Sequence, residues 1–185
     1  MLIKKDISLL LIVDVQEKLV SVIPKPRSFV ENIVKLQRAA RIFRIPIRYS
    51  EQYPKGLGKT IDSIRNNINK INLKDIIEKT EFAVPLNDRR LEIFLRDEGI
   101  HFIICGIEAH VCVLQTAINL SKNKKNTIYV VQDAVSSRYE KDYLTALSRL
   151  NKYSNIEIVS CEMVLFEWLR KSGTERFKTI SQLIK

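Results

Sequence analysis

The sequence predicts a three-layer α/β/α fold of the doubly wound type, with a six-stranded parallel sheet between two layers of helices. Six apolar segments rich in β-formers alternate along the chain with segments of helical periodicity. Several of the six are almost continuously apolar, as parallel strands are when helices cover both of their faces. A repeated strand–helix order implies right-handed crossovers, and it places ligand sites beyond the carboxyl ends of the strands.

Each expected strand is marked by its apolar run. In chain order the strands are ISLLLIVDV (7–15), IPIRYSE (45–51), a weaker DIIEKTE (75–81), HFIICGI (101–107), TIYVVQDA (127–134) and IEIVSC (156–161). Two helical stripes between them indicate core packing rather than cofactor contacts. These stripes are formed by Phe29, Val30, Ile33, Val34, Ala40 and Phe43, and by Tyr143, Leu144, Leu147 and Leu150.

Composition favours one compact domain over residues 1–185. The chain is 45% apolar and 28% charged, with five glycines and five prolines, so it can bury a core and shows no sign of disorder or a long linker.

The apolar start of the chain is interpreted as a strand. Asp6 interrupts the approach to it, Asp14 ends it, and no small-residue cleavage site follows, so no export signal is expected and the cytoplasm is the predicted location. No other apolar run approaches the roughly 18 residues that span a bilayer, so no membrane partner is expected.

The net charge of +10 arises from 31 basic and 21 acidic residues. The basic residues form short groups such as Lys122-Asn-Lys-Lys125, without a long basic arm or an aromatic-interleaved RNA-binding segment. This distribution favours a solvated surface over a nucleic-acid footprint, which is the weaker alternative.

Three cysteines and two histidines make a disulfide framework or a zinc site improbable, because the cysteines are odd in number and lack C-x-x-C spacing. No metal and no cofactor are therefore expected. The cysteines are predicted to be free thiols, and the question is which one is activated.

Two charged residues follow strands at the expected ligand edge. Asp14 ends the first apolar run, where its carboxylate could accept a proton from a nucleophile, although an Asp at this place could also cap the next turn. Lys79 ends the third run, where its ammonium group could stabilise a thiolate. Considered without its neighbours, it could equally be an ordinary lysine on the protein surface.

The segment HFIICGIEAHVCVLQTAINL passes from a strand through Gly106 into a helix that begins near His110. Cys112 would lie in the first turn, where the helix dipole and free N–H groups favour an anion, so we expect a lowered pKa for its thiol. Cys105 is expected to be a packing residue inside the strand. Cys161, at the end of the last strand, is a weaker candidate than Cys112 for a residue that lines the site. His110 is a poor base for Cys112, because residues two apart on a helix point roughly 200° away from one another.

Together, DVQEKL, KTEF and GIEAHVCV resemble, in that order, the motifs of the isochorismatase-like cysteine hydrolases. The segments SEQYPKGLG, CGIEAHVCV and VVQDAVSSR look most like the isochorismatase domain-containing subgroup, and the match covers nearly the whole chain. The resemblance implies that Cys112 is the nucleophile, Asp14 its base and Lys79 the cation that organises them. It also implies a cis peptide at Ile107-Glu108, with the N–H groups of Glu108 and Cys112 facing the oxyanion.

The implied reaction is hydrolysis of a small amide, carbamoyl or ester substrate through a thioester on Cys112. A metal-dependent nicotinamidase is disfavoured, because SEQYPKGLG stands where those enzymes carry a D-x-H element. The presence of Cys112 argues against action on isochorismate itself. Relatives form dimers to octamers, so a homo-oligomer is expected by resemblance.

The residues expected to line the substrate pocket are Gln16, Gln52, Tyr53 and Phe82, with Glu51 beside them. Asp133 and Arg138 are expected to cap and brace the turn after the fifth strand, and Trp168 to cover the pocket or pack a subunit interface. Two other functions stay open: a catalytically weak binding or scaffold subunit of this fold, and an RNA-binding, ribonuclease-like protein that uses the basic surface.

Overall fold

The computed structural model describes residues 1–66, 72–96 and 99–184. Within them the strands form one all-parallel sheet of six, in the order β3-β2-β1-β4-β5-β6, which confirms the predicted fold class. The strands are β1 (Ser8–Val13), β2 (Ile47–Gln52), β3 (Ile76–Lys79), β4 (His101–Ile107), β5 (Thr127–Ser136) and β6 (Ile156–Val159).

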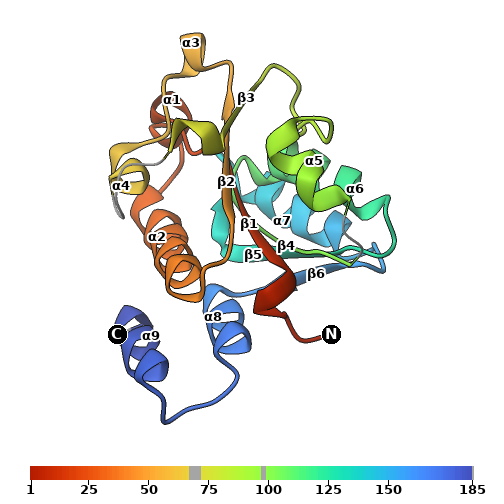
Figure 1. Ribbon diagram of the computed structural model, residues 1–185. Helices are drawn as coiled ribbons and strands as arrows, with labels where there is room; N and C mark the ends of the chain where they lie inside the picture. The colour runs from red at the N-terminus through yellow and green to blue at the C-terminus, as the bar shows by residue number, and fades with distance from the viewer. Residues whose placement is uncertain (67–71, 97–98, 185) are drawn as a thin grey trace.

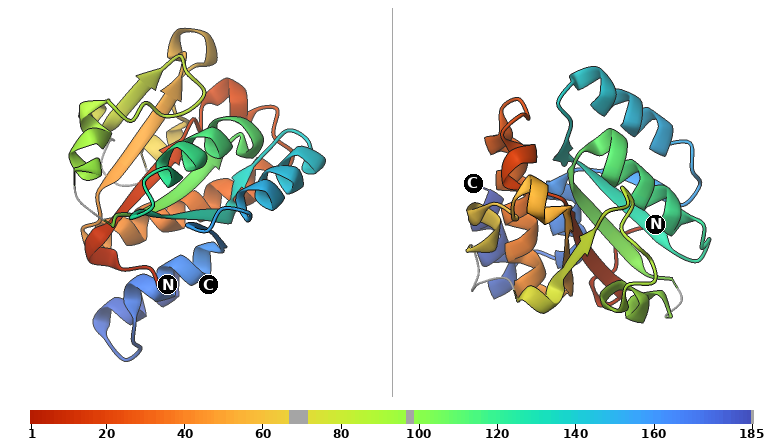
Figure 2. Two further views of the ribbon diagram at one scale, coloured as in Figure 1. Left: turned by 90° about the vertical axis from the view of Figure 1, so that its right-hand side faces the viewer. Right: turned by 90° about the horizontal axis from the view of Figure 1, so that it is seen from above.

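Helices cover both faces of the sheet (Figures 1 and 2). One face carries α2 (Pro26–Phe43), α8 (Cys161–Leu169) and α9 (Glu175–Ile184), and the other carries α5 (Arg89–Leu95), α6 (Leu114–Ser121) and α7 (Glu140–Leu150). Short helical turns connect these elements: η1 (Lys5–Ile7), α1 (Glu17–Val20), α3 (Pro54–Leu57), α4 (Asp62–Arg65), η2 (Leu73–Asp75) and η3 (Ala109–Val113).

The two helical layers explain the continuous apolar run of β1. Leu10 and Ile12 pack into the core under α2, α8 and α9, whereas Leu9 and Leu11 pack into the core under α5, α6 and α7. Successive side chains of a strand point to opposite faces, so every residue of β1 is buried.

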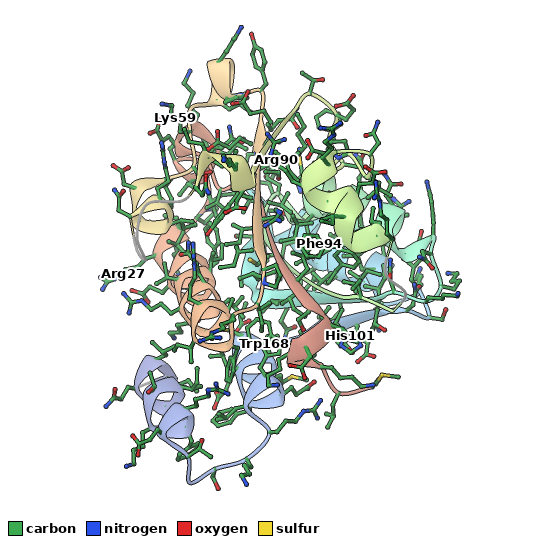
Figure 3. All side chains as sticks on the ribbon, viewed as in Figure 1. Arg27, Lys59, Arg90, Phe94, His101 and Trp168 are labelled. Atoms are coloured by element: carbon green, nitrogen blue, oxygen red, sulfur yellow. The ribbon has the colours of Figure 1, made fainter. Side chains whose placement is uncertain are left out.

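Trp168 does not cover a pocket or a surface, so that expectation is wrong. Its ring is fully buried, and its Nε1 donates a hydrogen bond to Ser8 Oγ at 3.1 Å. Ser8 begins β1, and Figure 3 shows Trp168 near His101, at the end of the sheet opposite α3. Trp168 therefore packs at the amino ends of the strands, away from the ligand edge.

Within the described ranges, no helix combines the length and the apolar character needed to cross a bilayer.

Candidate active site

The sheet changes its direction of winding between β1 and β4. From β1 the chain crosses through α2 to β2, and from β4 it crosses through α6 to β5 on the opposite face. The connections therefore diverge at the carboxyl ends of these two neighbouring strands, which is where open α/β sheets bind ligands. Figure 2, seen from above, shows this divergence.

Asp14 and Lys79 form a buried ion pair at this edge. Lys79 Nζ lies 2.7 Å from Asp14 Oδ2, and both side chains are fully buried. Asp14 follows β1 with a φ of 52°, and Lys79 is the last residue of β3. A strand, β2, lies between them in the sheet, so both charged side chains reach over it.

The Lys79 ammonium group is fully occupied by acceptors. Besides Asp14 it donates to Gln52 Oε1 at 2.7 Å, to the carbonyl oxygen of Phe82 at 3.0 Å and to that of Glu81 at 3.2 Å. An ammonium group has three protons, so these acceptors share all of them. The buried ammonium group is therefore paired with one carboxylate and three neutral oxygens.

Cys112 lies in η3 with its thiol against this pair. The side chain is 6% exposed, and Asp14 and Lys79 are the two charged groups that act on the thiol. Burial, followed by the negative charge of Asp14, raises the pKa of Cys112 to about 12, although Lys79 acts in the opposite direction.

The expectation of a lowered thiol pKa was therefore wrong. The charge of Lys79 is compensated by Asp14 in the same contact, so it does not offset the loss of solvent around the sulfur. Cys112 therefore rests as a neutral thiol at neutral pH.

The turn before Cys112 has an unusual backbone. Gly106 has a φ of 118°, and a Cβ there would collide with the backbone of Val13 on the neighbouring strand, so only glycine fits. The peptide bond Ile107-Glu108 is cis, as the resemblance implied.

Glu108 is fixed by its side chain while its N–H stays free. Its Oε2 accepts hydrogen bonds from the Arg138 backbone N–H at 2.9 Å and from Arg138 Nε at 3.2 Å. In the described part of the chain, no acceptor is found for the N–H of Glu108. Arg138 lies after β5, as expected, but the turn that its side chain braces is the one after β4.

The other sulfur and imidazole groups lie elsewhere. Cys105 is fully buried in β4, and Cys161 lies on the α2 side of the sheet, where its Sγ contacts Asn32 O at 3.6 Å. His110 Nδ1 lies 3.0 Å from Ser137 Oγ, which is consistent with its rejection as a base. No set of three or more His, Cys, Asp or Glu among the described side chains could hold a metal ion.

Asp133 differs from its expected role in the turn after the fifth strand. β5 continues to Ser136, so Asp133 lies inside the strand. Its Oδ1 accepts from the N–H of Cys161 at 2.7 Å and so caps the start of α8.

Two of the expected pocket residues are engaged with the protein itself. Gln16 is fully buried, and its Oε1 accepts a hydrogen bond from the Gln52 N–H at 2.7 Å. Its Nε2 donates to the carbonyl oxygens of Gln52 at 3.0 Å and Gly58 at 2.7 Å. Gln52 in turn accepts from Lys79 and donates to Thr80 O at 2.7 Å. Both amides therefore hold the site together.

Two aromatic side chains are exposed beside the ion pair. Tyr53 and Phe82 are each 54% exposed, and their backbones meet Lys79, because Tyr53 N–H donates to Lys79 O and Phe82 O accepts from Lys79 Nζ. Glu51 is buried and accepts from the N–H and the hydroxyl of Thr60, so it fastens the loop after α3.

Ser50 is a site residue that the sequence did not indicate. Its hydroxyl donates to Asp14 Oδ1 at 2.6 Å, and it lies two residues before Gln52 on the same face of β2. The signal that could have revealed it is the parallel pairing of β1 with β2, which brings the carboxyl ends of the two strands together.

Comparison with known proteins gives a matching family model and similar sequences. A family model described as Isochorismatase domain matches residues 8–162. Isochorismatase family protein 1B of Dictyostelium discoideum is 33% identical over 181 residues, covering 97% of this chain and 87% of that protein.

Two solved structures share the fold. One, named MAR1 ribonuclease from Caenorhabditis elegans, has a TM-score of 0.88 and 33% identity, covering 98% of this chain and 91% of its own. The other, the YcaC product of Escherichia coli, is described as an octameric hydrolase of unknown specificity; it has a TM-score of 0.81 and 19% identity, covering 98% and 89% of the two chains.

Proposed function

Because this chain belongs to the isochorismatase family, whose hydrolase fold it shares, we propose that it is a cysteine-dependent hydrolase of a small amide, carbamoyl or ester substrate. The observation that carries the proposal is the position of the Cys112 thiol beside a buried Asp14–Lys79 ion pair, where both charges act on it. A thiol with a raised pKa beside a carboxylate is a nucleophile with its base in place.

In the proposed acylation, Cys112 Sγ attacks the carbonyl carbon while the thiol proton passes to Asp14. The carbonyl oxygen becomes an oxyanion that accepts hydrogen bonds from the N–H groups of Glu108 and Cys112. The tetrahedral intermediate then collapses: the C–N or C–O bond breaks, and the leaving group takes the proton from Asp14. A thioester on Cys112 remains.

In the proposed deacylation, water attacks the thioester carbon and gives a proton to Asp14. The C–S bond breaks, the acid product leaves, and Asp14 returns the proton to the sulfur. Lys79 holds the Asp14 carboxylate in its ion pair between steps.

The remaining residues have supporting roles in this proposal. Gln16 and Gln52 hold the carboxyl ends of β1, β2 and β3 together, and Tyr53 and Phe82 offer exposed rings that a substrate could contact. A homo-oligomer, with the octameric Escherichia coli protein as its precedent, and a cytoplasmic location stay predictions.

The test is a screen of small amides and esters that compares wild type with Cys112→Ser. We expect the variant to lose at least about a thousandfold in kcat/KM, because a serine hydroxyl is a far weaker nucleophile at this site. Cys161→Ser is the matched control: it is a buried cysteine, 3% exposed, whose pKa is also raised to about 12 by burial. Equal rates in wild type and Cys112→Ser on every hydrolysed substrate would refute the proposal.

A second candidate is RNA binding, which the ribonuclease name of the Caenorhabditis elegans neighbour and the net charge of +10 favour. Phosphate contacts release counterions, so RNA binding would weaken steeply as salt rises. The test measures the affinity for single-stranded RNA at two salt concentrations, and RNA binding is rejected if no salt-dependent affinity is found.

The remaining alternative is a scaffold role without catalysis. In that case Cys112 should react with iodoacetamide no faster than a free thiol of the same pKa.

A further inference from the structure

Ser50 contacts the Asp14 carboxylate from the strand that lies between Asp14 and Lys79. Its Oγ donates to Asp14 Oδ1 at 2.6 Å, while Lys79 Nζ donates to Oδ2 at 2.7 Å. Ser50 is 1% exposed and Asp14 is 0% exposed, so water does not compete for either bond. A hydroxyl–carboxylate bond of this length belongs to the stronger, charge-assisted class.

Ser50 also holds the backbone of Asp14. The N–H of Asp14 donates to Ser50 O at 3.1 Å, and Asp14 adopts a φ of 52°, in the left-handed region. With a donor on each oxygen and a backbone tether to the same serine, the carboxylate cannot turn away from Cys112 without breaking a buried bond.

We propose that Ser50 is a positioning residue for the general base: its hydroxyl holds the Asp14 carboxylate in the orientation that faces the Cys112 thiol. The inference rests on the proposed function, in which Asp14 receives the thiol proton. Since burial raises the pKa of Cys112 to about 12, the thiol does not ionise unaided at neutral pH, and its reactivity depends on this base.

The experiment follows alkylation of Cys112 by iodoacetamide, which needs no knowledge of the substrate. In this reaction a bond forms between Sγ and the methylene carbon, the carbon–iodine bond breaks, iodide leaves, and the thiol proton passes to Asp14. Peptide mass spectrometry reports Cys112 separately from Cys105 and Cys161, and the rate is measured from about pH 5 to 9.

Ser50→Ala is expected to alkylate Cys112 about tenfold to a hundredfold more slowly at neutral pH, the range for loss of a hydrogen bond to a charged group. The slowing is expected because the carboxylate loses one of the two hydrogen bonds that hold its oxygens. A merely structural serine would leave the rate of Cys112 alkylation unchanged.

Two further comparisons separate positioning from folding. Ser8→Ala removes a serine that is 5% exposed and donates to Lys4 O at 2.7 Å, at the far end of β1, so it should cost stability without changing alkylation. Ser50→Thr keeps the hydroxyl and should restore the rate, whereas Ser50→Val has the same shape without it and should stay slow. The Thr–Val pair decides the matter if Ser50→Ala does not fold.

The outcomes distinguish the two proposals. If Asp14→Asn reacts as fast as wild type, Asp14 is not the base and the proposed function fails. If Asp14→Asn is slow but Ser50→Ala alkylates Cys112 at the wild-type rate, or Ser50→Thr is as slow as Ser50→Val, only the role of Ser50 is overturned.

Discussion

Replacing Lys79 with methionine should destabilise the fold strongly, because it leaves a buried carboxylate without its cation. The pair is 2.7 Å long with both side chains fully buried. Removal of one partner from such a pair costs about 3–5 kcal/mol. A domain is stable by about 5–15 kcal/mol, so Lys79→Met should remove a large part of the total.

Urea unfolding, followed by circular dichroism, measures this loss. With a slope of about 2 kcal/mol per molar urea, a cost of 4 kcal/mol moves the midpoint down by about 2 M. The control is Lys178→Met, which removes a lysine from an exposed pair with Glu175, 2.9 Å long, and should cause no clear change.

The double variant Asp14→Asn, Lys79→Met isolates the charge effect. Asparagine keeps an acceptor for Ser50 but carries no charge, so the double variant should be more stable than Lys79→Met alone by about 1 kcal/mol or more. A loss below about 1 kcal/mol in Lys79→Met, the range of surface pairs, would refute the reasoning about a buried and compensated pair.

Two further predictions concern the frame around the site. Burial lowers the pKa of His101 to about 4 from an ordinary 6.5, so its neutral ring contributes stability that is complete above pH 6.5 and is lost as the pH falls toward 4. Wild type should therefore lose about 2 kcal/mol more than His101→Gln between these pH values in urea unfolding, and parallel curves would contradict this. Gly106→Ala should cost more than about 3 kcal/mol, because its Cβ meets the Val13 backbone at a φ of 118°. Gly173→Ala, at a φ of 77° with nothing near its Cβ, should cost only about 1–2 kcal/mol, and equal losses in the two variants would count against the clash.

Contacts local in the chain were readable from the sequence. The apolar runs located all six strands, with β4 correct at both ends, because a strand buried between two helical layers must be apolar on both faces. The ends of the apolar runs also located Asp14 and Lys79 correctly, since each charged residue stands where an apolar run stops. Cys112 was correctly predicted to lie in the turn that begins the helix after the fourth strand.

Only the tertiary structure decided how these groups affect one another. The sequence predicted a lowered pKa for Cys112, whereas the structure raises it. The direction depends on the burial of the thiol and on the pairing of Asp14 with Lys79, two residues that are 65 positions apart in the chain. Ser50 was missed, since its role exists only once β2 lies beside β1. Trp168 was misplaced, because its partner Ser8 is 160 residues away. Periodicity and residue type fix which segments are buried, whereas a pKa or a hydrogen bond is set by distances across the fold, which no local pattern encodes.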